Sequence, residues 1–249
     1  MQLLEGKTAV IYGAGGAIGG AVARAFAREG AHVHLAGRTP ASLEVVARDI
    51  GSAGGRASVA VVDALDAEAV EAHAVAVGDI DIAFNAISVG DVQGTPLVDM
   101  SVDDFLAPIV AAARSNFLTW TAAARRMIAG GRGGVILCFG GGGNPLRDYS
   151  IGGFQIALQA VEALRRQLST EAGKHGVRVV TLRTGGIPET IPSGFSGREA
   201  LVSSLEAMTL TGRCATLADV GNVAAFVASD LARTMTGATV NISAGALLD

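Results

Sequence analysis

Cysteine, aromatic residues and charged residues are all scarce in this chain. Two of its 249 residues are cysteine, 4% are aromatic and 17% are charged. Cys138 and Cys214 do not have the spacing of metal ligands, and both lie in largely apolar stretches. We therefore expect structural, reduced thiols, no metal site and a cytoplasmic protein.

The chain also lacks a block of basic residues and an apolar run of membrane-spanning length. Its formal net charge is −4, so we do not expect a nucleic acid as partner. The longest early uncharged run, Thr8–Ala23, falls short of the roughly 20 apolar residues that cross a bilayer. Glu5 and Lys7 precede this run and no cleavage-like region follows it. We therefore expect neither a secretory signal nor a membrane contact.

Hydrophobic residues, in contrast, make up half of the chain, in short β-branched runs that alternate with stretches of helical periodicity. The strands that this pattern predicts are 8–12, 31–36, 57–62, 80–86, 134–139, 177–182 and 238–242. The predicted helices start at 17 and 40 and cover 66–77, 101–129 with an interruption at Pro108, 151–175 and 217–231. Such an alternation predicts one α/β domain over residues 1–249, a doubly wound parallel sheet of about seven strands with helices on both faces.

The segment Lys7–Gly20 combines a buried strand, a glycine turn and the start of a helix. Thr8–Tyr12 is a short apolar run, and from Ala17 onward the apolar residues follow helical spacing. Glycines let the backbone N–H groups of the turn approach a phosphate closely. Free N–H groups at a helix N-terminus attract anions as well. The segment therefore predicts a phosphate site, and a structural turn that binds nothing is the alternative.

With these elements in place, the chain resembles the short-chain dehydrogenase/reductase family over nearly its whole length. The family's glycine motif, Gly-x3-Gly-x-Gly, is matched by Gly13, Ala17 and Gly19, with Tyr12 where threonine is usual. Further matches are Asp63 at a strand end, Asn85-Ala86, Asn116, Thr184-Gly185 and Thr236-Gly237. The resemblance implies a Rossmann-like fold and an NAD(P)-dependent oxidoreductase with a small-molecule substrate. It also implies a homo-oligomer, tetramer or dimer, paired through the two long helices at 101–129 and 151–175.

The resemblance further implies which residues hold the cofactor. They are Gly13, Gly15, Ala17, Ile18, Gly19, Arg38, Asp63, Ala64, Asn85, Ala86, Thr184, Gly185 and Ile187. Within this set Asp63 has the place where the family holds the adenine ring.

The choice between NADP and NAD follows from the end of the second predicted strand. A carboxylate at this place would hydrogen-bond the ribose of NAD and repel a 2′-phosphate. This chain has Gly37 and then Arg38, whose guanidinium offers a fork of donors to a phosphate dianion. We therefore expect NADP(H) rather than NAD(H), and a merely solvated Arg38 is the alternative. His34 of the same strand is expected to be a packed residue rather than a ligand.

Most of the family's catalytic side chains are missing. Members of the family use Ser, Tyr and Lys, assisted by a helix asparagine. The alignment of 153–179 puts Phe154 at the Tyr position and Leu158 at the Lys position, and the Ser position falls at or near Gly141. Asn116 alone is kept, either as a catalytic residue or as a side chain that ties the interrupted helix together.

Few residues could replace the missing groups. The two lysines, Lys7 and Lys174, are far along the chain from the Tyr position. Tyr149 is the remaining candidate for a proton donor, with Arg147 close enough in sequence to shift its pKa. A tyrosine with an ordinary pKa near 10 is a poor proton donor, and a plain loop residue is the alternative.

Two hypotheses about function follow. In the first, the chain is an NADP-dependent oxidoreductase with a non-standard or impaired site, and reduces C=C or C=N bonds more readily than carbonyls because they need less acid help. In the second, it is a catalytically inactive dinucleotide- or ligand-binding protein, a sensor or partner subunit. The loops 88–98 and 188–211 carry no recognisable anchor for a particular substrate. The segment from 188 to 213 begins with Pro, Gly and Ser as a mobile lid often does.

Overall fold

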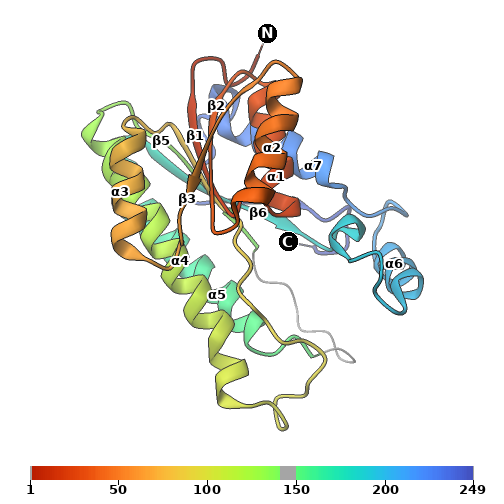
Figure 1. Ribbon diagram of the computed structural model, residues 1–249. Coiled ribbons are helices and arrows are strands. Elements are labelled where there is room, and N and C mark those ends of the chain that lie inside the picture. The colour runs from red at the N-terminus through yellow and green to blue at the C-terminus, as the bar shows by residue number, and fades with distance from the viewer. Residues whose placement is uncertain (1, 141–149, 249) are drawn as a thin grey trace.

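The chain forms one seven-stranded sheet in which every strand runs parallel to its neighbours (Figure 1). The computed structural model describes residues 2–140 and 150–248. The strands are β1 (Thr8–Tyr12), β2 (His32–Gly37), β3 (Arg56–Val61), β4 (Ile82–Asn85), β5 (Gly134–Phe139), β6 (Val177–Thr184) and β7 (Thr239–Ile242). Their order is β3-β2-β1-β4-β5-β6-β7, so the direction of winding reverses between β1 and β4. The predicted doubly wound, Rossmann-like α/β fold is confirmed.

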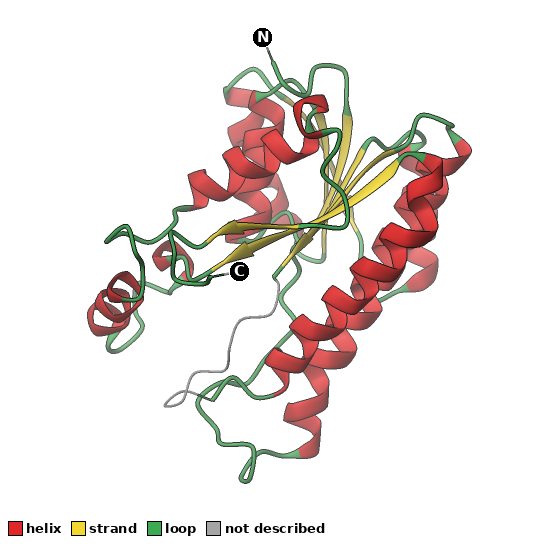
Figure 2. Ribbon diagram, turned by 180° about the vertical axis from the view of Figure 1, so that it is seen from behind, coloured by secondary structure: helices red, strands yellow, loops and turns green. Residues whose placement is uncertain are grey.

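Helices cover both faces of the sheet (Figures 1 and 2). One hydrophobic core lies under α1 (Ala17–Arg28), α2 (Pro40–Ser52) and α7 (Leu217–Ala228). The other lies under α3 (Ala67–Val77), α4 (Val102–Ala129) and α5 (Gly153–Ala172). The remaining elements are α6 (Arg198–Ala207) and short 3-10 turns at Gly173–His175, Pro188–Thr190 and Asp230–Ala232.

The strand register brings the carboxyl ends of three strands to one place. Tyr12, the last residue of β1, pairs with Ala36 of β2 and with Asn85 of β4. Beyond the strand, the Gly13 N–H donates to the Ala36 carbonyl at 2.9 Å. The Ala86 N–H donates to the Tyr12 carbonyl, also at 2.9 Å. Ligands of open parallel sheets bind at such a switch point.

The helices differ from the prediction at Pro108 and in the region after β6. α4 is continuous through Pro108, although an interruption was expected there. Proline removes one helical hydrogen bond, and the packing of ten buried α4 residues outweighs that loss. Part of the expected lid is α6, a helix with no buried residue, which the weak apolar pattern of 198–207 did not predict.

An ion pair between two side chains of α5 is buried against β6. Glu162 and Arg165 are 5% and 4% exposed, and the Arg165 Nη2 donates to Glu162 Oε2 at 2.9 Å. The Thr181 hydroxyl of β6 donates to the other carboxylate oxygen. Because an unpaired buried charge costs several kcal/mol, this triad fixes the position of α5, the helix that carries Phe154 and Leu158. Cys138 and Cys214, predicted to be structural, are buried free thiols.

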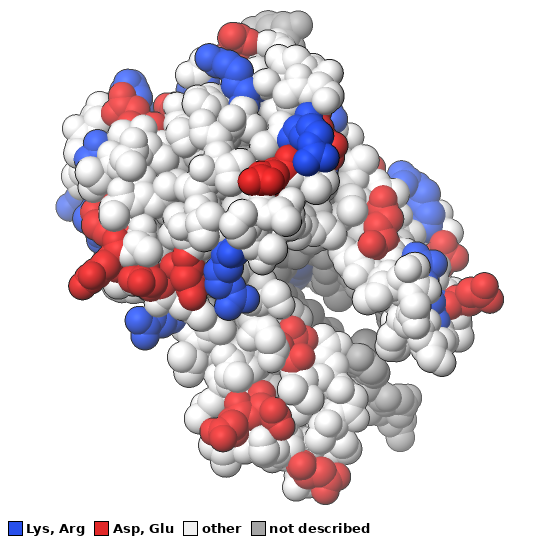
Figure 3. Space-filling model, in the orientation of Figure 1, with Lys and Arg blue, Asp and Glu red and all other residues white. Residues whose placement is uncertain are grey.

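The surface carries charges of both signs in small groups. On the face shown in Figure 3, Lys and Arg side chains are scattered among acidic ones. Among the described helices, none is both long and apolar enough to cross a bilayer. Within residues 2–140 and 150–248, no group of three or more His, Cys, Asp or Glu side chains is arranged so that it could hold a metal ion.

Candidate functional site

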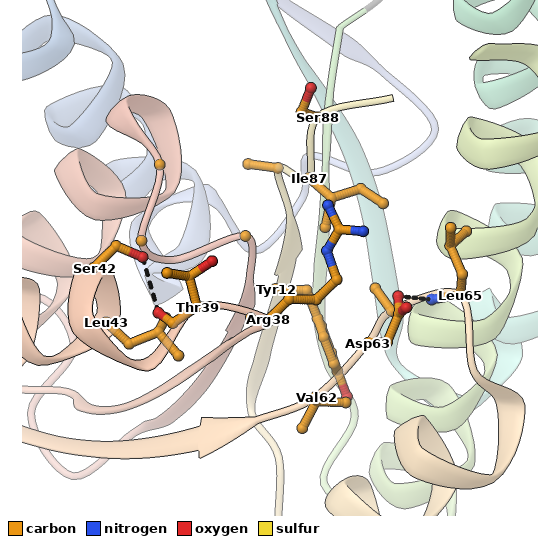
Figure 4. A pocket seen from close by; sticks show the side chains of 16 residues that line it. Tyr12, Arg38, Thr39, Ser42, Leu43, Val62, Asp63, Leu65, Ile87 and Ser88 are labelled. Carbon is orange, nitrogen blue, oxygen red and sulfur yellow. Dashed lines mark hydrogen bonds between the residues drawn. The ribbon is translucent and has the colours of Figure 1, made fainter. Parts of the chain in front are cut away.

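A pocket of about 290 Å³ opens where β1, β2, β3 and β4 end. Its walls come from four connections that follow these strands (Figure 4). The lining residues are Tyr12, Gly13, Gly15, Gly16, Gly37, Arg38, Thr39, Ser42, Leu43, Val62, Asp63, Ala64, Leu65, Ala86, Ile87 and Ser88. Six of the residues predicted to hold a cofactor are thereby brought together: Gly13, Gly15, Arg38, Asp63, Ala64 and Ala86.

The glycine turn has close backbone contacts that exclude larger residues. Gly13 has a φ of +77°, and a Cβ placed on it would lie 2.5 Å from the Ala86 carbonyl oxygen. A Cβ on Gly19 would lie 2.3 Å from the Gly13 carbonyl oxygen. Gly16, the N-cap of α1, offers no side chain to the helix. The first N–H groups of α1 therefore have no side-chain cap competing with an anion for them.

Arg38 lies at the mouth of the pocket, directly after β2. Its side chain is exposed, and in Figure 4 the guanidinium extends toward Ile87. Within the described part of the chain, Arg38 has neither a hydrogen-bond nor an ion-pair partner. Thr39 is the N-cap of α2 without a side-chain cap bond, and the Ser42 hydroxyl donates to the Thr39 carbonyl at 3.0 Å. A cation and two hydroxyl groups thus border the same corner of the pocket.

Asp63 follows β3 on the opposite wall. One of its carboxylate oxygens accepts a hydrogen bond from the Leu65 N–H at 2.9 Å (Figure 4). This bond orients the side chain and leaves the second oxygen available to a ligand. The next residue, Ala64, is 4% exposed and packs beneath the pocket.

Asn85 lies behind the pocket wall and is not part of the lining. It is 5% exposed, and its amide nitrogen donates to the Thr119 hydroxyl at 3.1 Å. Its amide oxygen accepts from the Ile87 N–H at 3.1 Å. Both ends of the amide are therefore engaged within the protein, and they fix the Ala86–Ile87 wall relative to α4.

The remaining predicted cofactor residues lie outside the lining of this pocket. Ala17, Ile18 and Gly19 form the first turn of α1. Thr184, Gly185 and Ile187 lie at the end of β6, where Ile187 is 5% exposed and belongs to the core beneath α1 and α7. The structure therefore places these six residues beside the pocket or in the core, not on its walls.

Sequence reasoning missed ten lining residues. These are Tyr12, Gly16, Gly37, Thr39, Ser42, Leu43, Val62, Leu65, Ile87 and Ser88. Eight of them lie within one or two positions of a predicted residue, and the other two, Ser42 and Leu43, lie in the first turn of α2. Extending each predicted strand end by a few residues would have found most of them, because all parallel strands end at the same edge of the sheet.

The two side chains predicted to stand at the family's Tyr and Lys positions are apolar. Phe154 and Leu158 lie in the first turns of α5. A Cβ placed on Gly140, directly after β5, would lie 2.7 Å from the Leu158 Cδ2. Leu158 therefore packs closely against the end of β5. Gly141 and Tyr149, the other two residues discussed for the catalytic centre, lie outside the described residues.

Asn116 lies within α4, with its side chain 8% exposed. Its amide nitrogen donates to the Ala112 carbonyl one turn earlier at 2.8 Å. The bond is of the kind expected for a side chain that ties the helix together. The amide oxygen has no hydrogen bond among the described residues, so it can still accept one.

The comparison with known protein families agrees with this geometry. A family model described as "Enoyl-(Acyl carrier protein) reductase" matches residues 13–246. The chain is a short-chain dehydrogenase/reductase. This family consists of oxidoreductases that bind NAD(P). In doubly wound sheets a dinucleotide binds in the crevice at the switch point, and the pocket of this short-chain dehydrogenase/reductase opens at that point.

Curated relatives of this short-chain dehydrogenase/reductase match it over nearly its full length. Galactitol 2-dehydrogenase (L-tagatose-forming) of Cereibacter sphaeroides is 30% identical over 248 residues, which are 97% of this chain and 95% of the relative. Gluconate 5-dehydrogenase of Gluconobacter oxydans is 28% identical over 247 residues, with 97% and 95% covered.

Solved structures show the same fold. A short-chain type dehydrogenase/reductase from Mycobacterium marinum has a TM-score of 0.87 at 28% identity, covering 98% of this chain and 96% of that one. Carveol dehydrogenase from Mycobacterium avium, in complex with NAD, has a TM-score of 0.89 at 24% identity over the full length of both chains.

Replacing Gly13 by alanine tests the close approach at the pocket. Gly54 is a matched control, because its φ is +80° and a Cβ on it would meet nothing within 4 Å. Both substitutions lower the free energy of unfolding by about 1–2 kcal/mol, because a residue with a Cβ disfavours the left-handed backbone conformation. G13A adds the overlap with the Ala86 carbonyl, so we expect a larger loss of unfolding free energy in urea and no dinucleotide binding by calorimetry. Equal stability and equal binding in G13A and G54A would contradict the contact.

Proposed function

We propose that this short-chain dehydrogenase/reductase binds NADP(H) in the pocket described above. The observation that carries the proposal is Arg38, a cation without a partner among residues 2–140 and 150–248, at the place where a carboxylate would select NAD. In this arrangement the guanidinium binds the 2′-phosphate, and the Thr39 and Ser42 hydroxyls border the same corner. The glycine turn and the N-terminus of α1 bind the pyrophosphate, and Asp63 binds the adenine ring.

We further propose that its redox chemistry is non-standard or impaired. The nicotinamide, when bound, supplies or accepts a hydride. The proton that carbonyl reduction also needs has no phenol or ammonium source at Phe154 and Leu158. General acid–base help is worth typically about 10²–10⁴ in rate, so activated C=C or C=N bonds are the favoured substrates. Tyr149, a water held by the Asn116 oxygen, or the substrate itself supplies the proton.

A second function is favoured by the packing of Leu158. Its Cδ2 lies within 2.7 Å of the position that a Gly140 side chain would need. Because this packing fills the space next to β5 with apolar atoms, a cofactor could bind and never react. The chain would then be a catalytically inactive sensor or partner subunit that binds a dinucleotide or another ligand.

We also propose a homo-oligomer, tetramer or dimer, paired through α4 and α5. Large apolar side chains on these two helices are exposed in the single chain. Val110 is 57% exposed, Phe117 53% and Ile156 46%. Exposed apolar groups on adjacent long helices are typical of a contact between copies.

The Arg38→Ala variant tests the choice of cofactor. Losing a charge-assisted contact to the 2′-phosphate should weaken NADPH binding about 10- to 100-fold and leave NADH binding within about twofold. Arg38→Asp should reverse the preference. Arg132→Ala is the control. It removes the same charge at the opposite end of the sheet, where Arg132 pairs with Asp79. Calorimetric titration of both cofactors checks this, and the assignment of Arg38 is wrong if NADPH and NADH weaken equally.

The Phe154→Tyr/Leu158→Lys double variant tests the missing acid. We expect wild type to oxidise NADPH with cyclohexenone in single turnover, and to fail with galactitol, D-threitol or gluconate and NADP⁺. The double variant should raise alcohol oxidation about 10²-fold, and each single variant should raise it far less. A wild type that binds NADPH without reacting with any of these compounds would support the inactive alternative. A wild type that oxidises the alcohols rapidly would refute the impaired site.

The Phe117→Asp variant tests the oligomer. A carboxylate buried at the α4–α5 contact costs several kcal/mol, so the mass measured by analytical ultracentrifugation should fall to half or less. Val61→Asp is the control, because Val61 is 62% exposed on the edge strand β3. It should leave the mass unchanged. A monomeric wild type at micromolar concentration would overturn this proposal.

A further inference from the structure

Tyr12 links the glycine turn to the two walls next to it. Its main chain pairs with Ala36 and Asn85, and its carbonyl accepts the Ala86 N–H. Gly13, the next residue, is bonded to the Ala36 carbonyl. A displacement of Tyr12 would therefore move both the turn and the Ala86 wall of the pocket.

The Tyr12 side chain leaves the pocket and enters the core beneath α3. In Figure 4 its ring runs away from Arg38, and the hydroxyl ends beside Val62. The hydroxyl lies 3.1 Å from the Nδ1 of His73, a residue of α3. The two ring centroids are 5.6 Å apart in an edge-on arrangement, and the side chains are 2% and 9% exposed. This hydrogen bond joins the end of β1 directly to α3.

Other polar groups surround this contact on the same face of the sheet. His34 of β2 interacts electrostatically with both His73 and His32. The rings of His32 and His34 have centroids 4.5 Å apart, and the His32 Nε2 lies 2.9 Å from the Ser58 hydroxyl of β3. Arg56 of β3 faces His32, and Glu71 of α3 faces Tyr12. Glu71 is itself paired with Arg125 of α4.

We propose that the Tyr12–His73 hydrogen bond positions the glycine turn for the dinucleotide and makes its affinity depend on pH. The proposal rests on the binding of NADP(H) proposed above. Neither side chain touches the cofactor in this scheme, and both act as positioning residues through the backbone of Tyr12, Gly13 and Ala86.

The dependence on pH follows from the burial of both side chains. Burial raises the pKa of Tyr12 and lowers the pKa of His73 from its usual 6.5, so both side chains are neutral at pH 7. The Nδ1 of a neutral imidazole can accept a hydrogen bond from the tyrosine hydroxyl, whereas a protonated Nδ1 cannot. Among the described residues, no carboxylate is hydrogen-bonded to His73 to compensate the charge. Burial, His32 and His73 likewise lower the pKa of His34 to about 4.

The direction in which the affinity changes with pH is therefore fixed. Positioning is complete at neutral pH and is lost as the pH falls below the usual pKa of about 6.5 toward the lowered pKa of His73. Dinucleotide affinity should fall over the same range.

Three variants and a control test the proposal. Tyr12→Phe removes the hydroxyl and keeps the ring. His73→Leu removes the acceptor, and His73→Asn keeps a hydrogen-bonding atom near Nδ1 that does not titrate. The control, Ser229→Ala, removes a buried hydroxyl that donates to the Phe226 carbonyl, at the end of α7. For each protein we measure the dissociation constant of NADPH from pH 7.5 to 5, the thermal midpoint, and hydrogen exchange of the amides of 13–18 and 86–88 without cofactor.

We expect Tyr12→Phe and His73→Leu to weaken NADPH binding about three- to tenfold at pH 7.5, the effect of one lost hydrogen bond. In both variants amide exchange should be faster at 13–18 and 86–88. His73→Asn should bind nearly as wild type at pH 7.5. At pH 5 the NADPH affinity of wild type should fall more than that of His73→Asn. Because both proteins bind the same ligand, comparing them removes the contribution of the 2′-phosphate's own titration. Ser229→Ala should lower the thermal midpoint only.

Two failures are distinguishable. If wild type binds NADPH but the three Tyr12 and His73 variants match it in affinity, pH profile and exchange, the positioning role is refuted and the cofactor site stands. If wild type does not bind NADPH, the proposed function is refuted. Exchange at 13–18 and 86–88 then decides alone whether Tyr12 and His73 hold the turn.

Discussion

The close approach of the Gly13 backbone to the Ala86 carbonyl is the constraint on which the pocket depends. A side chain at Gly13 would lie 2.5 Å from that oxygen, so the turn after β1 and the loop after β4 can meet only through glycine. The parallel pairing of β1 with β2 and β4 brings the same ends into line. Arg38 and Asp63 follow β2 and β3 at this edge, which is why residues 25 positions apart border one cavity.

The substitutions that we propose at the family's catalytic positions are consistent with one another. A lysine without its tyrosine partner would leave a poorly compensated charge near the end of β5, at a cost of several kcal/mol. Leucine at 158 packs against Gly140 instead, and phenylalanine at 154 keeps the ring without the hydroxyl. The Glu162–Arg165 pair and Thr181 hold the same helix on β6. The helix that carries Phe154 and Leu158 is therefore anchored on the sheet through polar groups of its own.

Several features needed the tertiary structure. The continuity of α4 through Pro108 could not be inferred from local propensity, because packing of the buried face stabilises the helix against the loss of one hydrogen bond. Asn85 matched a motif residue, yet its amide is engaged by Thr119 and Ile87 behind the pocket wall. Tyr12 was noted only as a departure from threonine. Its contact with His73 joins residues 61 positions apart, and no local pattern contains that information.

By itself the sequence determined the order of the strands and of the helices other than α6, the parallel sheet, the family and the glycine turn. These follow from the spacing of apolar residues and glycines, which acts over a few neighbouring positions. Only the tertiary structure decided which residues border the pocket, that Arg38 lacks a partner in the described part of the chain, and that Leu158 packs against the end of β5. Each of these is a distance between residues far apart in the chain, set by strand register and by how closely α3, α4 and α5 pack on the sheet.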